Sequence, residues 1–566
     1  MEPLASRGER TWLRRGLAFA RARASWWAPL LVTVCAARYA ANALYSASFA
    51  AFGRDQGIFH YVAWALSRGA YDYVDLREIN GPFIHLLHVV AFWFGGQDEH
   101  RFRVLDLTLS CLCFAGIGAL VAPTTASWRA RLGWALAGAQ VLVAHYMLYT
   151  WWDQGQRESF YVLFLLASVA LQWHVLGAPN APRARVWLAL SSALATTTCF
   201  GKPTCALFLL VCAGLVLALA PRPSRGGFAR ALGVGALLGA APFVLFFARW
   251  GDAAACFRIL VREIPILYRY IWSKTWLECY AAWGNPARLD PALLTLLVAT
   301  IAIVTRALPR RLALLVGFQA AGLITFFVQR KGFPYHLHAV TAATHLIWLA
   351  SAAELVGKLE AARPHKALPW VLAVATLGLA ARTRSELDGC DAVRAPYAAL
   401  AARHGLGSRE YWAYFNGGDF FALDMRDAAA FVRAHTPKDT PIQTYGMDPY
   451  VLFLAERESA TPYLYSFELD VDAAREGQRK LGASEAERAE LDALASRNAA
   501  SWLAALERRP PSAFVLFDKA PFTFPENAHD DLRRKLPEVA AWIDARYRPA
   551  ATFGTVRVLL PQEVAK

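Results

Sequence analysis

The sequence contains few charged residues for its length. Only 18% of its 566 residues are Asp, Glu, Lys or Arg, whereas 56% are hydrophobic and the mean hydropathy is +0.28. A single soluble globule of this composition would have more apolar side chains than its core could bury, so that class of protein is excluded. The sequence therefore indicates an integral membrane protein, with the lipid bilayer as its first partner.

Several other signals are absent. The sequence has no Cys-x-x-Cys pair and no His-Glu-x-x-His motif, so no metal or other cofactor is predicted, and the question of a divalent ion is left open. The formal net charge of +15 comes from basic residues spread over short connections between apolar runs. This spread is typical of the cytoplasmic loops of membrane proteins, and it argues against a nucleic-acid partner.

Apolar runs recur along the first two thirds of the chain. A helix needs about 20 apolar residues to cross a bilayer, and a run over residues 186–220 would be too long as one helix. Lys202-Pro203 divides it, because proline cannot continue the helical hydrogen-bond ladder. We therefore expect a polytopic α-helical membrane protein with about eleven spans: 25–48, 102–122, 132–150, 159–176, 186–201, 204–220, 229–248, 289–305, 312–328, 336–355 and 367–381.

The basic residues predict the sidedness of these spans. No small-residue cleavage site follows the arginine-rich start of the chain, so the first span is expected to be uncleaved, with the amino terminus in the cytoplasm. The cytoplasmic connections then hold thirteen basic residues: Arg129, Arg131, Arg183, Arg185, Arg222, Arg225, Arg230, Arg306, Arg310, Arg311, Lys358, Arg363 and Lys366. The short outer connections hold only Arg157, Lys202, Arg330 and Lys331. The positive-inside rule favours this arrangement, although the outer loop 249–288 carries six basic residues.

The first outer loop carries an ordered set of small motifs. They are Asp55-Gln56-Gly57, a helical stretch over 61–68, Gly69 with Tyr71 and Tyr73, Glu78 before Gly81-Pro82, a second helical stretch over 82–95, and Phe94-Gly95. The second stretch is too short to span and is expected to lie in the membrane interface.

This loop resembles that of the GT-C superfamily, the polyprenyl-phosphate-sugar glycosyltransferases that include protein O-mannosyltransferases and lipid A aminoarabinose transferases. The resemblance extends to about residue 381. It implies an inverting, metal-independent enzyme of the bacterial inner membrane that transfers a sugar from a polyprenyl phosphate to an outer acceptor, which is a protein, a lipid or a glycan. Gln56 stands where many relatives carry a second acid, and Asn80-Gly81-Pro82 where others have Lys-Pro-Pro, so the sugar is not identified.

Asp55 is the candidate general base, because it is the acid at the position that the family uses. Transfer of a sugar needs the acceptor hydroxyl to lose its proton as it attacks the anomeric carbon, and a carboxylate at the water–lipid boundary can accept that proton. The alternative is that Asp55 caps a helix beginning near Gly57, and both roles can hold together.

The leaving lipid phosphate needs cations or oriented N–H donors. The candidates are Lys202, Arg157, Lys331, His336 and His338, and the alternative is that such residues only anchor helix ends at the interface. Supporting or acceptor-binding roles are predicted for Glu78, Asp153 and Glu158. For the last two, a plain interfacial belt made by Trp151 and Trp152 is the competing interpretation.

The chain changes character after residue 382. Segment 383–566 is more charged, with strand-like stretches at 440–446 and 512–518 among helix-like ones, which predicts an extracytoplasmic α/β domain beside a membrane domain of residues 1–382. Gly446 followed by Asp448-Pro449 indicates a helix start and a candidate anion site.

Two other functions compete with glycosyl transfer. A secondary transporter would show paired halves and ionisable residues in mid-membrane, whereas the predicted spans contain few of these and no half-repeat is visible. A ligase or polymerase of surface polysaccharide would share the lipid-linked donor.

Overall fold

The structure, a computed structural model, describes residues 23–361, 368–417 and 419–562. Most of the basic amino terminus, Arg363 and Lys366 therefore lie outside the described residues. The chain divides into two compact units: residues 1–48, 103–241 and 276–395 form the first, and residues 49–102, 242–275 and 396–566 form the second. Both units thus draw on segments from each side of residue 382, and the predicted division there stays a prediction.

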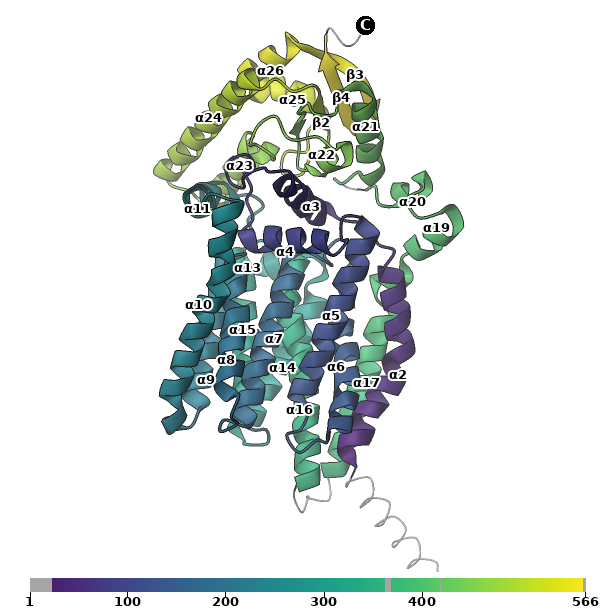
Figure 1. The fold of residues 1–566 in the computed structure, drawn as a ribbon, viewed down its shortest axis with the longest axis vertical. Helices are drawn as coiled ribbons and strands as arrows, with labels where there is room; N and C mark the ends of the chain where they lie inside the picture. Colours follow the sequence, from purple (N-terminus) through teal and green to yellow (C-terminus); the bar gives the residue numbers. More distant parts are fainter. Residues whose placement is uncertain (1–22, 362–367, 418, 563–566) are drawn as a thin grey trace, which may run out of the picture. The chain divides into compact units, whose positions relative to one another are not determined.

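The first unit is built around long apolar helices (Figure 1). Every predicted span coincides with a helix, namely α2 (Ala24–Ala47), α5 (Glu99–Val121), α6 (Trp128–Met147), α7 (Arg157–Gly177), α8 (Ala184–Cys199), α9 (Ala206–Leu219), α10 (Arg225–Arg249), α14 (Pro286–Val304), α15 (Leu312–Gln329), α16 (His338–Ala361) and α17 (Leu368–Asp388). Short elements of this unit are η1 (Pro203–Cys205), η2 (Arg222–Ser224), α13 (Trp276–Ala281), η4 (Ala282–Gly284), η5 (Pro334–Leu337) and α18 (Asp391–Arg394). The predicted break at Lys202-Pro203 is confirmed, because α8 ends at Cys199 and η1 begins at Pro203.

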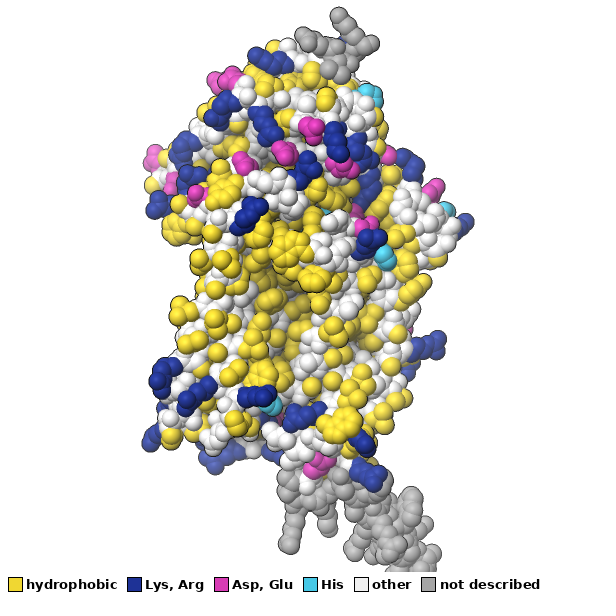
Figure 2. All heavy atoms as spheres, in the orientation of Figure 1, with side chains coloured by type: hydrophobic (Ala, Val, Ile, Leu, Met, Phe, Trp, Pro, Cys, Tyr) yellow, Lys and Arg dark blue, Asp and Glu magenta, His cyan; other side chains and the backbone are white. Residues whose placement is uncertain are grey.

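Within the described residues, six segments are long and apolar enough to cross a membrane: Glu99–Val121, Arg157–Gly177, Arg222–Arg249, Pro286–Val304, Leu312–Gln329 and Pro334–Glu360. Figure 2 shows hydrophobic side chains over the sides of the helices, and Lys and Arg side chains at their lower ends. The protein is thus a multi-pass membrane protein, and the count of eleven spans and their orientation stay predictions.

Small residues let neighbouring helices approach closely. A Cβ atom at Gly235 would lie 2.1 Å from the carbonyl oxygen of Ala189, and one at Gly239 would lie 2.3 Å from that of Ala193. The Gly-x-x-x-Gly spacing on α10 therefore brings its backbone against α8, as is common where helices pack within a bilayer.

The second unit begins with the first loop. Two helices are present there as predicted, α3 (Arg54–Ser67) and α4 (Pro82–Trp93). Helix α3 begins at Arg54 rather than at residue 61, because the extended backbone of Gly53 already provides its amino-terminal cap. The loop that follows α10 contributes α11 (Ala253–Phe257), a π-helical turn (η3, Arg258–Glu263) and α12 (Ile264–Tyr268).

The carboxyl-terminal segment adds a small mixed sheet. Its four strands are β1 (Gln443–Tyr445), β2 (Phe514–Phe517), β3 (Tyr547–Phe553) and β4 (Val556–Pro561), in the order β1-β2-β4-β3. The pair β1–β2 is parallel and the other two pairs are antiparallel. The two predicted strand regions are confirmed. The β3–β4 hairpin was not predicted, because β3 is a largely exposed edge strand with Pro549 at a register shift, which weakens its alternating pattern.

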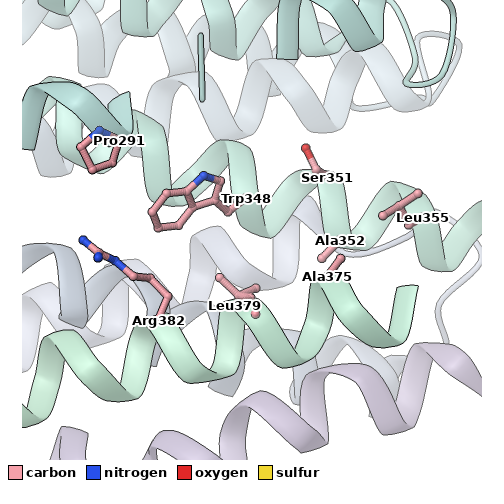
Figure 3. A pocket seen from close by; sticks show the side chains of 9 residues that line it. Pro291, Trp348, Ser351, Ala352, Leu355, Ala375, Leu379 and Arg382 are labelled. Carbon is pink, nitrogen blue, oxygen red and sulfur yellow. The ribbon is translucent and has the colours of Figure 1, made fainter. Parts of the chain in front are cut away.

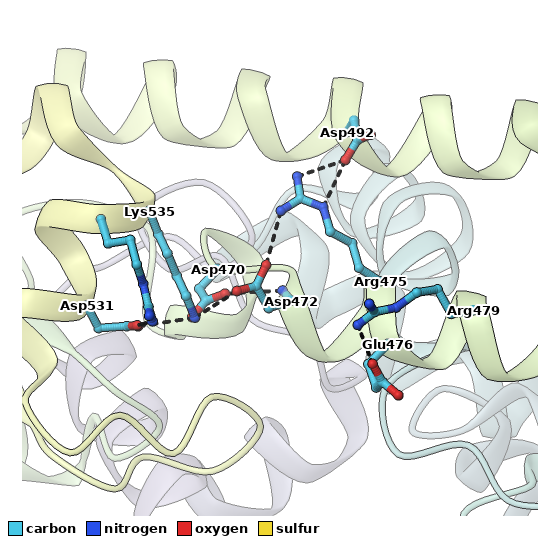
Figure 4. Close-up of polar contacts among 9 residues, drawn as sticks. Asp470, Asp472, Arg475, Glu476, Arg479, Asp492, Asp531 and Lys535 are labelled. Carbon is cyan, nitrogen blue, oxygen red and sulfur yellow. Dashed lines mark hydrogen bonds and ion pairs between the residues drawn. The ribbon is translucent and has the colours of Figure 1, made fainter.

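In the described part of the carboxyl-terminal segment, nine helical elements accompany this sheet, and ion pairs join some of them. They are α19 (Tyr397–His404), α20 (Arg409–Tyr414), α21 (Ala422–His435), α22 (Tyr450–Ala455), η6 (Ser466–Glu468), α23 (Asp472–Leu481), α24 (Glu485–Arg508), α25 (Ala528–Lys535) and α26 (Pro537–Asp544). The ammonium group of Lys535 lies 2.5, 3.0 and 3.2 Å from carboxylates of Asp470, Asp472 and Asp531 (Figure 4). This network connects α25 to the start of α23.

Candidate functional site

Three of the five predicted phosphate-binding residues gather around one carboxylate in the first unit, and a fourth interacts with one of these three. Arg157 Nε lies 3.0 and 3.1 Å from the two carboxylate oxygens of Glu158. Lys202 Nζ lies 2.9 Å, and His336 Nε2 3.8 Å, from Glu158 Oε1. Lys331 interacts electrostatically with His336. We call Arg157, Glu158, Lys202, Lys331 and His336 the basic cluster.

The basic cluster joins three helix ends that are distant in the sequence. Arg157 and Glu158 begin α7, Lys202 lies in the turn between α8 and η1, and His336 lies in η5 before α16. Gly201 allows these helix ends to pack closely. A Cβ atom at this position would clash with the ring of Tyr161, at a distance of 2.3 Å. The sequence places each residue at a helix end, and the packing of the helices brings those ends together.

The loop that carries Lys331 is held in a defined conformation. Asn285 donates hydrogen bonds from Nδ2 to the carbonyl oxygens of Gly332 (2.7 Å) and Cys279 (2.8 Å). Arg330 and Gly332 both have left-handed backbone angles, with φ of 54° and 67°. These turns place Lys331 in a buried position, where its exposed fraction is 3%.

Burial makes the two lysines of the basic cluster receptive to an anion. It lowers the pKa of Lys331 to about 7, and it lowers the pKa of Lys202 below its usual value although Glu158 opposes this effect. The Glu158 carboxylate faces Arg157, Lys202 and His336 in a partly desolvated place, and Lys331 adds a further cation beside His336. An additional anion would restore charge balance there.

His338 and Asp153 lie beside this cluster. The ring of His338 stacks on that of Tyr149 at 3.6 Å, and its Nε2 lies 3.1 Å from the backbone carbonyl oxygen of Asp153. Among the described residues, His338 forms no hydrogen bond or ion pair with Glu158. The structure therefore places His338 in contact with the 150–156 loop, and its interaction with Glu158 is electrostatic only.

Buried polar residues that sequence reasoning missed hold the 150–156 loop. Arg103 donates from Nη1 to the carbonyl oxygen of Gln154 (2.9 Å) and from Nη2 to that of Trp151 (3.2 Å). Tyr146 accepts a hydrogen bond from the backbone N–H of Gly155 (2.7 Å) and donates one to Asp106 (2.6 Å). Arg103 and Asp106 are a base and an acid three positions apart inside a predicted span, which is a signal that could have identified them.

Asp55 and Glu78 lie in the second unit, where both interact electrostatically with Tyr465. Glu78 is fully buried and accepts hydrogen bonds from the backbone N–H groups of Ile79 and Asn80, from Asn80 Nδ2 and from Tyr465 Oη (2.6 Å). Burial raises the pKa of Tyr465 far above its usual value, so the phenol remains a donor. Asp55 is half-buried in the first turn of α3, and the expectation that it caps this helix is wrong because Gly53 is the cap residue.

Buried ion pairs join the first loop to the carboxyl-terminal segment of the same unit. Arg54 Nε lies 2.9 Å from Asp448 Oδ1, and Arg77 forms ion pairs with Glu468 and Glu263. Asp448 belongs to the stretch predicted as an anion site, and the structure corrects that expectation. Its carboxylate is paired with Arg54, and the short helix α22 that follows begins beside this pair. The partners are hundreds of positions apart, so no local pattern indicates them.

The histidines of α4 have structural partners. His85 Nδ1 lies 2.7 Å from Asp72 Oδ2, and the ring of His88 stacks on Phe102 at 4.6 Å. Within the part of the chain that the structure describes, no group of three His, Cys, Asp or Glu side chains could hold a metal ion.

A separate apolar cavity of about 420 Å³ lies between α14, α16 and α17 (Figure 3). Trp348, Leu355 and Leu379 contribute to its wall, and Arg382 lies at one end of it. None of the predicted site residues lines this cavity, so it is distinct from the basic cluster.

Solved structures with a similar fold are available for comparison. ArnT from Cupriavidus metallidurans bound to undecaprenyl phosphate superposes with a TM-score of 0.52 and 15% identity, covering 94% of this chain and 99% of that one. The same protein in the apo state gives a TM-score of 0.54 and 16% identity, covering 96% and 99%. The chain has the fold of ArnT.

ArnT is a GT-C superfamily member, so the fold implied by the motifs of the first loop is confirmed. At this level of identity the likeness concerns the fold alone, and the roles assigned to Asp55 and to the basic cluster stay predictions. No protein-family model matches the sequence, and no curated protein matches it.

Proposed function

We propose that this protein is a membrane glycosyltransferase that moves a sugar from a polyprenyl phosphate to an acceptor on the extracytoplasmic face. The basic cluster carries this proposal, because it is a buried, cation-rich site at the ends of membrane-spanning helices. A lipid phosphate is the anion that reaches such a depth naturally. The ArnT fold supports the proposal, since that protein was crystallised with undecaprenyl phosphate.

The basic cluster fits the charge that develops during transfer. In a sugar–phosphate–lipid donor the phosphate carries one negative charge, and it gains a second as the bond to the sugar breaks. Lys202 and Arg157 are already oriented by Glu158, so they need little rearrangement to stabilise that charge. Lys331 and His336 add further hydrogen-bond donors to the same cluster.

Asp55 is proposed as the general base, acting on the acceptor hydroxyl late in the reaction, when the attacking oxygen has become acidic. A single displacement of this kind inverts the anomeric configuration. Glu78 is proposed as a supporting residue, because its four hydrogen bonds fix the loop near Tyr465.

Comparison of cell-envelope glycans tests this function. Mass spectrometry of lipids, proteins and polysaccharides from cells with and without the gene is expected to show one sugar missing from one acceptor class. Purified protein in liposomes is then expected to consume the matching undecaprenyl-phosphate sugar. Identical glycans in both strains, with no donor consumed by the purified protein, would contradict the proposal.

The affinity for undecaprenyl phosphate is expected to fall as the pH rises above 7. The pKa of Lys331 is about 7, and a bound phosphate favours its charged form, so binding takes up a proton at higher pH. From pH 7.5 to 9.5 the phosphate itself is already fully ionised. We therefore expect the Kd to rise by up to about tenfold per pH unit.

The matched variant for this measurement is Lys331→Arg. Its guanidinium stays charged over the whole range, so its Kd should be nearly independent of pH. Equal pH dependence in the wild type and in this variant would show that Lys331 does not face the phosphate.

A further inference from the structure

A second group of cations lines a pocket at another end of the spanning helices. The pocket has a volume of about 370 Å³ and is lined by Arg306, Leu308, Pro309, Arg310 and Lys358. Its basic residues come from the connection between α14 and α15 and from the last turns of α16. No carboxylate belongs to its described lining, so the pocket presents positive charge only.

The acidic residues nearest in the sequence to Lys358 are engaged elsewhere. Glu354 forms an ion pair with Arg311, and Glu360 accepts a hydrogen bond from the backbone N–H of Ser25 at 2.8 Å. Among the described residues, Arg306 and Arg310 have no carboxylate partner. Their charge is therefore available to a ligand.

The conformation of the 305–311 loop holds Arg306 at the pocket. Arg306 has a left-handed backbone (φ 61°) just after the end of α14, a position where glycine is the usual and less strained residue. The loop is closed by hydrogen bonds from Arg306 N to Ile303 O (3.1 Å) and from Leu308 N to Ala302 O (3.0 Å). Lys358 also donates to the carbonyl oxygen of Ala307. An arginine at such a strained position indicates that its side chain has a role in the pocket.

The surroundings of the pocket specify the ligand. The loop connects two membrane-spanning segments, Pro286–Val304 and Leu312–Gln329, and Lys358 lies near the end of a third, Pro334–Glu360. The pocket therefore lies at the depth of the lipid headgroups. Basic pockets between spanning helices bind anionic headgroups, through charge and through hydrogen bonds to phosphate.

We propose that this pocket binds the phosphate-containing headgroup of an anionic phospholipid. The site is separate from the basic cluster and does not depend on the proposed transferase activity. The acyl chains of the lipid lie along the apolar sides of α14 and α16, while Leu308 and Pro309 contact the glycerol region.

Native mass spectrometry of the purified full chain tests this site. We expect phosphatidylglycerol to be retained more strongly than phosphatidylcholine. In the double variant Arg306→Gln/Arg310→Gln, the affinity for phosphatidylglycerol should fall about 30-fold, roughly fivefold for each arginine. The double variant Arg222→Gln/Arg230→Gln removes equal charge from another predicted cytoplasmic connection and should leave the affinity unchanged.

Two further measurements complete the test. Lys358→Gln alone should weaken phosphatidylglycerol binding, which covers the case in which the double variant fails to fold. Inorganic phosphate, added as a competitor, should not displace the lipid at equal concentration. Unchanged lipid preference in the pocket variants, equal loss in the control variant, or displacement by free phosphate would each overturn the proposal.

Discussion

Replacement of Asp55 by asparagine is expected to reduce sugar transfer by about 10²- to 10⁴-fold, the range that general-base catalysis supplies. Asparagine has nearly the same shape but cannot accept the proton of the acceptor hydroxyl. The side chain is half-buried and is not the cap of α3, so folding should be unaffected. The measurement is the initial rate of transfer in liposomes, together with the Kd for undecaprenyl phosphate, which should not change.

The control for this variant is Asp98→Asn. Asp98 is an exposed acid of the same loop whose carboxylate accepts a hydrogen bond from the backbone N–H of Arg101. Its substitution makes the same chemical change and should leave transfer intact. Glu78→Gln is a poorer test, because it would disturb four hydrogen bonds at once. Full activity in Asp55→Asn would refute the assignment of the base.

Replacement of Lys202 by glutamine is expected to lower the rate of transfer by about 10²- to 10³-fold, the usual effect of removing one donor from a preorganised anion site. Glutamine removes the positive charge that lies 2.9 Å from Glu158. Glu158 keeps its contact with Arg157, so no buried carboxylate is left unpaired and the helices should still pack. Binding of undecaprenyl phosphate should weaken at the same time.

An exposed arginine of the same unit provides the comparison for Lys202→Gln. Arg129→Gln makes an equal change in net charge at the start of α6, outside the basic cluster. It should leave donor binding and transfer unchanged, with an unfolding temperature similar to that of the wild type. Loss of activity in both variants would point to a general effect of charge. Loss in neither would remove Lys202 from the phosphate site.

Much of the architecture follows from local patterns in the sequence. An apolar run long enough to cross a bilayer has few alternatives to a helix, because its backbone groups cannot remain unpaired in lipid. The predicted spans therefore coincide with helices, and proline at Lys202-Pro203 ends one of them where expected. The hairpin β3–β4 was not predicted, because an exposed edge strand shows little alternation of apolar and polar residues.

The sequence by itself determined that this is a membrane protein, where its long helices lie, and which polar residues stand near their ends. Only the tertiary structure decided that Glu158 lies between Arg157 and Lys202 with His336 nearby. It also decided that Tyr465 interacts electrostatically with both Asp55 and Glu78. It also revealed Arg103, Asp106 and Tyr146 as the supports of the 150–156 loop. Periodicity and composition report on neighbours along the chain, whereas these contacts join residues brought together by helix packing, which no local pattern encodes.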